Sequence, residues 1–202
     1  MTRHRHIRAG STAVNATTPP KERTLYLIRH GELDVRAFAK HQRTAGLTAR
    51  GRRQASLTAR ALRGLSVSAI HCSTLGRARE TARIIAEVFP DVTVRATTLL
   101  WELPYISSTT APRAVIARDK RRGERAFARF VRPTRQRQRI EILVSHGNLI
   151  RYIVCRTLGI APESCGALGT SHCGITVLSI IDRHVRVTGY NDTRHLPVRL
   201  RT

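Results

Sequence analysis

The chain has 202 residues, of which 41% are apolar, and its formal net charge is +23 at pH 7. This length and apolar content suit a single globular domain with an ordinary core. No apolar run approaches the length needed to span a bilayer, and the spacing of the four cysteines matches no zinc site, so the sequence argues against both classes of protein. The charge by itself predicts weak, non-specific attraction to polyanions such as nucleic acid.

The first 20 residues are basic and contain Arg, His, Ser and Thr but no acidic residue. Such a composition resembles a transit peptide, although the apolar face that a transit helix needs is thin here. We therefore expect residues 1–21 to form a disordered basic tail and residues 22–202 to form one domain. The expected location is the cytoplasm, with import into an organelle through the tail as the alternative.

Apolar periodicity predicts alternating strands and helices after the tail. The polar stretch 32–46 has no clear period and is expected to be a basic loop. The order of the remaining elements predicts a three-layer α/β/α sandwich with a mainly parallel central sheet. Strands are expected at residues 25–28, 67–72, 92–96, 140–144, 174–181 and 184–190, and helices after Thr48, between Thr74 and Pro90, at 111–132 and at 148–158.

Two segments share one pattern, a short apolar run that leads directly into His-Gly. His30 ends the first run and His146 ends the second. Ligands of open α/β sheets bind at the carboxyl ends of the strands. A lone His at a strand end is more often structural, but two of them, together with Arg29 and with Arg77 in the first turn of a following helix, would form a compact cationic pocket. Such a pocket suits a tetrahedral dianion such as phosphate.

The segments around these residues resemble those of a known family. Leu27–Glu32, Leu47–Ala55, Ser73–Ala82, Val144–Gly147 and Asn191–Leu196 are similar, in the same order, to signature segments of the histidine phosphatase superfamily, the phosphoglycerate-mutase-like proteins. The helix after the second His is most similar to that of the protein phosphatases of this superfamily in mitochondria, which have small bacterial relatives. The resemblance covers about residues 24–197 and implies the phosphoglycerate-mutase-like fold.

The resemblance also implies a two-step reaction without a metal or cofactor. His30 would attack phosphorus and become a phosphohistidine. Glu102 would protonate the leaving oxygen and then activate the water that hydrolyses the intermediate. The residues expected to hold the phosphate or the rest of the substrate are Arg29, Arg77, His146 and Gly147, with Arg36 and Arg43 nearby.

Two departures from the family pattern affect the expected substrate. Glu32 is followed by Leu33-Asp34-Val35-Arg36, where many members carry Thr-x-x-Asn, so either Arg36 or no residue replaces the polar side chain expected near the phosphate. The insert between Glu102 and His146 is short, whereas sugar-phosphate mutases usually have longer inserts that close over the substrate. An open site lets water reach the phosphohistidine, and this favours a phosphatase over a mutase.

Three functions therefore remain open at this point. The leading one is a phosphomonoesterase, with a phosphoprotein as its candidate substrate. The second is a small-metabolite phosphatase or phosphoglycerate-type mutase. The third is a non-specific nucleic-acid-binding protein, which rests on charge alone because no recognised nucleic-acid-binding motif is present. The Arg-rich segments 113–125 and 132–139 would favour a large or highly charged substrate if they rim the pocket.

Overall fold

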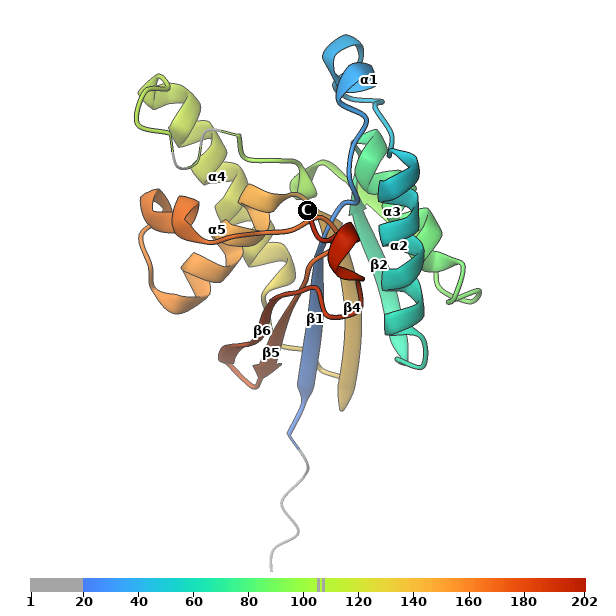
Figure 1. Ribbon diagram of the computed structural model, residues 1–202. Coiled ribbons are helices and arrows are strands. Elements are labelled where there is room, and N and C mark those ends of the chain that lie inside the picture. Colours follow the sequence, from blue (N-terminus) through green and yellow to red (C-terminus); the bar gives the residue numbers. More distant parts are fainter. Residues whose placement is uncertain (1–19, 105, 107) are drawn as a thin grey trace, which may run out of the picture.

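The computed structural model describes residues 20–104, 106 and 108–202. Its centre is a six-stranded sheet in the order β3-β2-β4-β1-β5-β6, with α2 and α3 on one side and α4 and α5 on the other (Figure 1). β1 to β4 run parallel, and β5 and β6 are antiparallel to their neighbours. The strands are β1 (Glu22–Arg29), β2 (Val67–Ser73), β3 (Val94–Thr97), β4 (Gln138–Ser145), β5 (Ile175–Ile181) and β6 (His184–Asp192).

The three-layer sandwich and its mainly parallel sheet confirm the fold expected from the sequence. The helices are α1 (Val35–Lys40), α2 (Ala49–Leu62), α3 (Gly76–Ala86), α4 (Arg113–Phe130) and α5 (Gly147–Leu158), with 3-10 turns at Thr98–Leu100, Pro162–Ala167 and Val198–Leu200. Nearly all of the expected tail, residues 1–21, lies outside the described residues. Among the helices that are described, none is both long and apolar enough to cross a bilayer.

The expectation of a loop over residues 32–46 was wrong in part, because this stretch contains α1. Asp34 caps the helix: its carboxylate accepts hydrogen bonds from the backbone N–H groups of Arg36 and Ala37. α1 has no buried residue, so it carries no apolar periodicity that would reveal it in the sequence. The helix lies beyond the carboxyl ends of the parallel strands (Figure 1).

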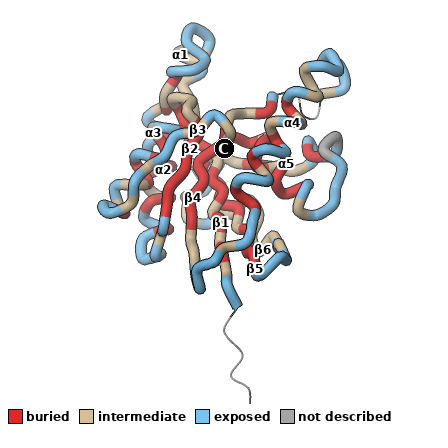
Figure 2. Tube along the Cα trace, turned by 180° about the vertical axis from the view of Figure 1, so that it is seen from behind, coloured by how far each residue is buried: buried red, intermediate tan, exposed pale blue. Residues whose placement is uncertain are grey.

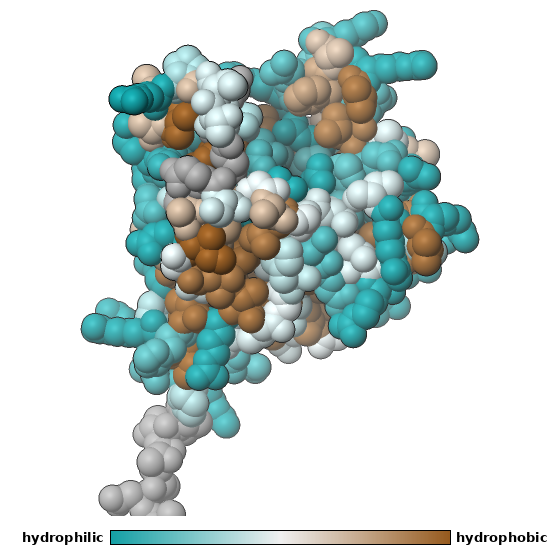
Figure 3. Space-filling model, turned by 60° about the vertical axis from the view of Figure 1, so that its left-hand side comes forward, coloured by the Kyte–Doolittle hydropathy of each residue, from teal (hydrophilic) through white to brown (hydrophobic). Residues whose placement is uncertain are grey.

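The core lies on both faces of the sheet. Figure 2 shows the strands largely buried, whereas the outer surfaces of the helices are exposed. Side chains of β1 alternate: Leu25 and Leu27 pack with α4 and α5, whereas Ile28 packs with α2 and α3. All four cysteines are buried thiols that form no disulfide. On the side that carries α4 and α5, apolar surface gathers in one area and hydrophilic side chains project around it (Figure 3).

Two glycines let the chain turn sharply after β1. A Cβ atom on Gly31 would lie 2.6 Å from the carbonyl oxygen of Gly51, and one on Gly51 would lie 2.2 Å from the carbonyl oxygen of Glu32. Real Cβ atoms do not approach backbone this closely. The loop that follows His30 therefore passes directly against the first turn of α2.

We expect Gly51→Ala to lower the free energy of unfolding by about 1–3 kcal/mol, because the added methyl group meets backbone atoms that cannot move aside. Chemical denaturation of both proteins measures this loss. Gly169→Ala is the matched control, since a Cβ at Gly169 meets nothing within 4 Å. Equal stability of the two variants would show that the loop can move away from α2.

Candidate active site

His30 and His146 meet at the carboxyl edge of the sheet because their strands are parallel neighbours. Arg29 at the end of β1 is paired with Ser145 at the end of β4, and each His is the next residue in its chain. The backbone N–H of His30 donates to the carbonyl oxygen of Ser145 over 3.0 Å. The two rings are 5.1 Å apart between centroids, and both side chains are buried. The structure thus brings together the pair of histidines singled out in the sequence.

The hydrogen bonds of His30 define which nitrogen is free to react. Its Nδ1 lies 2.8 Å from the carbonyl oxygen of Gly31, which can only accept, so Nδ1 carries the proton. The Nε2 lone pair accepts a hydrogen bond from Nε of Arg77 over 3.2 Å. Nε2 is therefore unprotonated and directed into the cationic cluster, as a nucleophile at this position must be.

Burial lowers the pKa of both histidines well below the ordinary value. For His30, the neighbouring His146 ring and the cations Arg77 and Arg29 lower the pKa further, against the hydrogen bond to Gly31. For His146, burial is the largest cause, and the positive charges of Arg77, Arg29 and Arg122 lower the pKa further. Both imidazoles consequently stay neutral at pH values at which a free imidazole is protonated, and the His30 lone pair is retained.

Arg77 and Arg29 bring positive charge to His30 from two directions. Arg77 projects from the first turn of α3, is 5% exposed and donates to the carbonyl oxygen of Gln42. Arg29 ends β1 and donates to the carbonyl oxygen of Thr170. Burial lowers the pKa of both guanidiniums, and Glu102 opposes that shift in each case. Glu102 is therefore close enough to act electrostatically on both cations.

Glu102 lies between the cationic cluster and the start of α5. One carboxylate oxygen, Oε1, accepts hydrogen bonds from the backbone N–H groups of Leu103 and Asn148, over 3.0 and 3.1 Å. Burial raises the pKa of this carboxyl group, although those two N–H groups and the guanidiniums of Arg29 and Arg77 oppose the increase. A raised pKa keeps the carboxyl group protonated to a higher pH than in a free glutamate, which suits a group that gives and then takes a proton.

Buried nitrogen atoms without a hydrogen-bond partner gather at this edge of the sheet. Among the described residues they are Nε of Arg29, Nε of Arg122, both ring nitrogens of His146 and Nε2 of His172. Buried polar groups in proteins are nearly always paired, so such a concentration needs an explanation. The tetrahedral oxygens of a phosphoryl group would satisfy several of these nitrogens at once.

Comparison with known proteins agrees with this geometry. A model of the histidine phosphatase superfamily (branch 1) matches residues 25–119 and 116–193. The chain belongs to the histidine phosphatase superfamily. It is 34% identical over 175 residues to the serine/threonine-protein phosphatase PGAM5, mitochondrial, of Xenopus laevis, a match that covers 83% of this chain and 64% of that relative. The chain thus spans a little under two thirds of the relative's length.

Solved structures show the same fold. A phosphoglycerate mutase from Plasmodium falciparum is 26% identical, with a TM-score of 0.62 over 88% of this chain and 96% of that chain. Bacillus stearothermophilus YhfR is 20% identical, with a TM-score of 0.72 over 87% of this chain and 100% of that chain, which shows the fold alone. Membership of this superfamily confirms the expected phosphatase class. The relative is named as mitochondrial, so the expected cytoplasmic location gains no support.

The histidine phosphatase site also contains residues that the sequence did not reveal. The His172 ring, from the loop before β5, lies 5.6 Å from the His30 ring, and burial together with Arg29 lowers the pKa of His172 to about 4. Arg122 of α4 donates to the backbone oxygen of Glu102 and to the buried carboxylate of Asp119. Neither residue lies in a recognisable motif. The one local signal for Arg122 was its spacing from Asp119: residues three apart on a helix lie on the same face and can pair.

The further substrate-binding residues expected from the sequence have different positions. A cavity of about 640 Å³ opens beside the cluster, and Arg43, Arg77, Glu102, Arg118 and Arg122 are among its lining residues. Two of these residues belong to the Arg-rich segment 113–125, so this segment rims the cavity. A segment in this position was expected to favour a large or highly charged substrate. Arg36 is an exposed residue of α1 and does not line this cavity, and segment 132–139 lines a separate one. Gly147 begins α5 next to Arg29.

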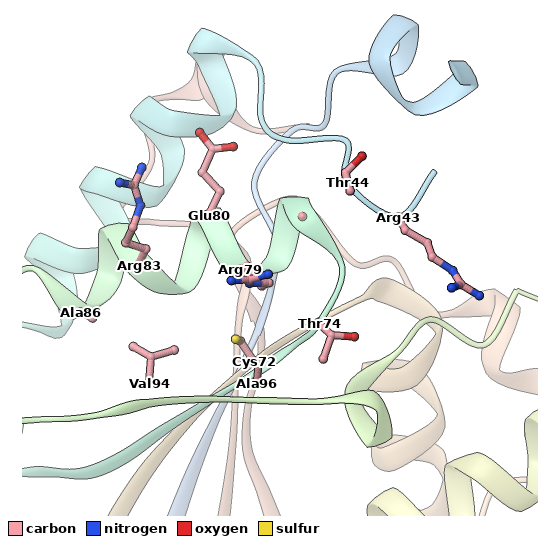
Figure 4. Close-up of a pocket in the computed structure, with 11 residues that line it drawn as sticks. Arg43, Thr44, Cys72, Thr74, Arg79, Glu80, Arg83, Ala86, Val94 and Ala96 are labelled. Carbon is pink, nitrogen blue, oxygen red and sulfur yellow. The ribbon is translucent and has the colours of Figure 1, made fainter. Parts of the chain in front are cut away.

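A groove of about 560 Å³ adjoins the catalytic cavity between α3 and β3 (Figure 4). Arg43 lines both spaces. The indole N–H of Trp101, on the cavity side, donates to the hydroxyl of Thr74 on the groove side. Arg79 and Arg83 of α3 are among the lining residues of the groove, and no ion pair among the described residues involves either of them. The groove thus extends the cationic surface away from His30.

Proposed function

We propose that this chain is a metal-independent phosphomonoesterase that forms a phosphohistidine on His30 and acts on phosphorylated polypeptides. The observation that supports the mechanism best is the state of His30: a neutral, buried imidazole whose proton is held on Nδ1 and whose Nε2 lone pair lies among guanidinium groups. Family membership makes phosphoryl transfer the reaction class to which this geometry applies.

The proposed first step forms a bond between Nε2 of His30 and phosphorus and breaks the bond from phosphorus to the ester oxygen. Arg77, which donates to Nε2 in the free protein, would turn to a phosphoryl oxygen and release the lone pair. Arg29 and His146 would bind the remaining oxygens as charge develops on them. Protonated Glu102 would give its proton to the leaving oxygen, so that the product departs as a neutral alcohol.

The proposed second step returns the enzyme to its starting state. Ionised Glu102 would take a proton from water as the water oxygen attacks phosphorus, and the bond from phosphorus to Nε2 would break. Inorganic phosphate leaves, His30 is again neutral, and Glu102 is again protonated. The insert between Glu102 and His146 is short in the sequence, and a site left open to water would favour hydrolysis over transfer to a second substrate group.

A polypeptide substrate is supported by the groove between α3 and β3. A chain whose phosphorylated residue occupies the catalytic cavity can extend past Arg43 along this groove. Acidic residues beside the phosphorylated residue would meet Arg79 and Arg83. Glu80, the acidic residue of the groove, is already engaged by Arg52 and by the backbone N–H of Leu47. The relative from Xenopus laevis is likewise named as a protein phosphatase.

Steady-state kinetics tests this substrate class. We expect kcat/KM to be higher for an acidic phosphoserine peptide than for sugar phosphates or 3-phosphoglycerate. The double variant Arg79→Gln/Arg83→Gln should raise KM for the acidic peptide by about threefold to tenfold, because each exposed ion pair contributes little, and should leave p-nitrophenyl phosphate hydrolysis unchanged. Arg60→Gln/Arg63→Gln removes the same charge from exposed positions on and just after α2 and serves as control. Mutase activity, or equal effects of both double variants, would contradict the proposal.

A further inference from the structure

A second cationic cavity lies away from the catalytic edge. Its volume is about 380 Å³, and its lining contains six arginines and a single acidic residue, Glu141. The arginines are Arg23, Arg95, Arg129, Arg132, Arg135 and Arg139. Arg23 precedes Arg29 by six residues on β1, which corresponds to about 20 Å along a strand. The cavity is therefore separate from the phosphoryl-transfer site.

The floor of this cavity is a buried ion cluster on the sheet face that α4 and α5 cover. Arg23 is paired with Arg139 across β1 and β4, and His71 is paired with Leu143, so these side chains share the face of Leu143. Glu141 is 1% exposed and Arg23 is 4% exposed. Apolar residues normally fill such positions, so burying charge here must be offset by pairing.

Glu141 is fully engaged by the cations around it. Nε of Arg23 donates to Oε2 over 2.6 Å, Arg139 donates to Oε1 over 2.9 Å, and Nε2 of His71 lies 3.5 Å from Oε1. Burial by itself would raise the pKa of Glu141, but hydrogen bonds from His71, Arg139 and Arg23 outweigh it and hold that pKa far below the usual range. The carboxylate is therefore permanently charged and has no capacity left for the outer arginines.

Four arginines stand above this floor without a carboxylate partner. Arg95 comes from β3, Arg129 from the end of α4, and Arg132 and Arg135 from the linker into β4. None of the four takes part in an ion pair among the described residues. The backbone of Arg132 is tied to the floor, because its carbonyl oxygen accepts a hydrogen bond from Arg23 over 3.1 Å. With one carboxylate for six guanidiniums, five positive charges around the cavity remain uncompensated.

We propose that this cavity binds a compact polyphosphate anion with two or more linked phosphate groups. Planar guanidinium groups bind phosphate oxygens in pairs, and several of them converging on one recess match closely spaced negative charges. The lining residues include no Phe, Tyr or Trp ring on which a base could stack, and the His71 ring is engaged by Glu141 and packed against Phe130. They also include no free carboxylate that could hold an amine. Recognition is thus directed at the phosphate groups themselves and not at an attached base or amine.

Isothermal titration of the full chain with tripolyphosphate at physiological salt tests this site. Arg95→Gln/Arg132→Gln/Arg135→Gln should weaken binding by at least about tenfold, because each lost guanidinium removes charge-assisted hydrogen bonds. Arg53→Gln/Arg60→Gln/Arg63→Gln removes the same charge elsewhere and should change binding little. Equal weakening in the two triple variants would identify non-specific attraction to a +23 chain and overturn the proposal.

Three further variants or probes separate the remaining explanations. Arg95→Lys/Arg132→Lys/Arg135→Lys keeps the net charge, and we expect it to bind several-fold more weakly because the paired hydrogen bonds are lost. Arg77→Gln should bind tripolyphosphate as the native chain does, and loss of binding in this variant would place the anion in the catalytic site.

A lipid headgroup is the other source of linked phosphate groups. The chain should bind vesicles containing phosphatidylinositol bisphosphate no more tightly than it binds tripolyphosphate. Tighter binding to the vesicles through the cavity arginines would overturn the proposal of a soluble ligand in favour of a lipid headgroup. Circular dichroism confirms that each variant is folded.

Discussion

His30→Ala should reduce the hydrolysis of p-nitrophenyl phosphate by at least about a thousandfold, because it removes the nucleophile on which both proposed steps depend. The remaining cations can still bind phosphate, so KM should change far less than kcat. Activity of the native chain should survive EDTA, since no proposed step uses a metal. Rapid quenching with a 32P-labelled phosphopeptide should trap acid-labile label on the native chain and none on the variant.

His184→Ala is the control for this experiment, because His184 is an exposed residue at the start of β6. It should keep native activity and the labelled intermediate. Thermal melting separates loss of chemistry from loss of fold, which matters because the His30 ring is buried between His146 and His172. A folded His30→Ala protein with native activity would rule out His30 as the nucleophile, and acid-stable label would place the phosphoryl group on another residue.

The sequence predicted the parts of this molecule that depend on local pattern. Apolar runs gave the strands, and the two runs that lead into His30 and His146 gave the catalytic edge, because parallel strands align their carboxyl ends. Thr48 was expected to cap a helix, and it caps α2 by accepting a hydrogen bond from the backbone N–H of Gly51. Such features need only neighbouring residues, so a single sequence contains them.

Features that depend on distant partners were not predicted. His172 reaches the His30 ring from a position more than 140 residues later in the chain. Arg23 and Glu141 are separated by 118 residues and neither was singled out in the sequence, yet they form the buried floor of the second cavity. Their charges are acceptable inside the protein only because each finds the other there, and no local pattern reports such a pairing.

The distribution of arginines also became clear only from the tertiary structure. In the sequence, segments 113–125 and 132–139 look alike, and both were expected to matter only if they rimmed the pocket. The structure separates them: Arg118 and Arg122 face the catalytic cavity, whereas Arg132 and Arg135 face the second one. The turn of the chain after α4 causes this division, because it carries the linker to the opposite end of β4 from His146.

Glu102→Gln should lower kcat for a phosphoserine peptide by about a hundredfold to ten-thousandfold, the usual contribution of a positioned general acid and base. Gln retains an oxygen that can accept from the N–H groups of Leu103 and Asn148, so the start of α5 should stay in place. p-Nitrophenolate leaves without a proton. With that substrate the variant should therefore release a burst of about one equivalent of product and then turn over slowly, because hydrolysis of the phosphohistidine still lacks its base.

The pH dependence distinguishes this role from a structural one. Burial raises the pKa of Glu102, so the protonated acid persists to higher pH than in a free glutamate and is lost as pH rises through the raised pKa. In the native chain, phosphoserine hydrolysis should therefore decline on that alkaline limb, and Glu102→Gln should lack it. Glu87→Gln, an exposed carboxylate after α3, should keep the native profile. If Glu102→Gln instead kept native kcat and an unchanged limb, the carboxylate would serve only to hold the first turn of α5, and the proton would have to come from another group in the cavity.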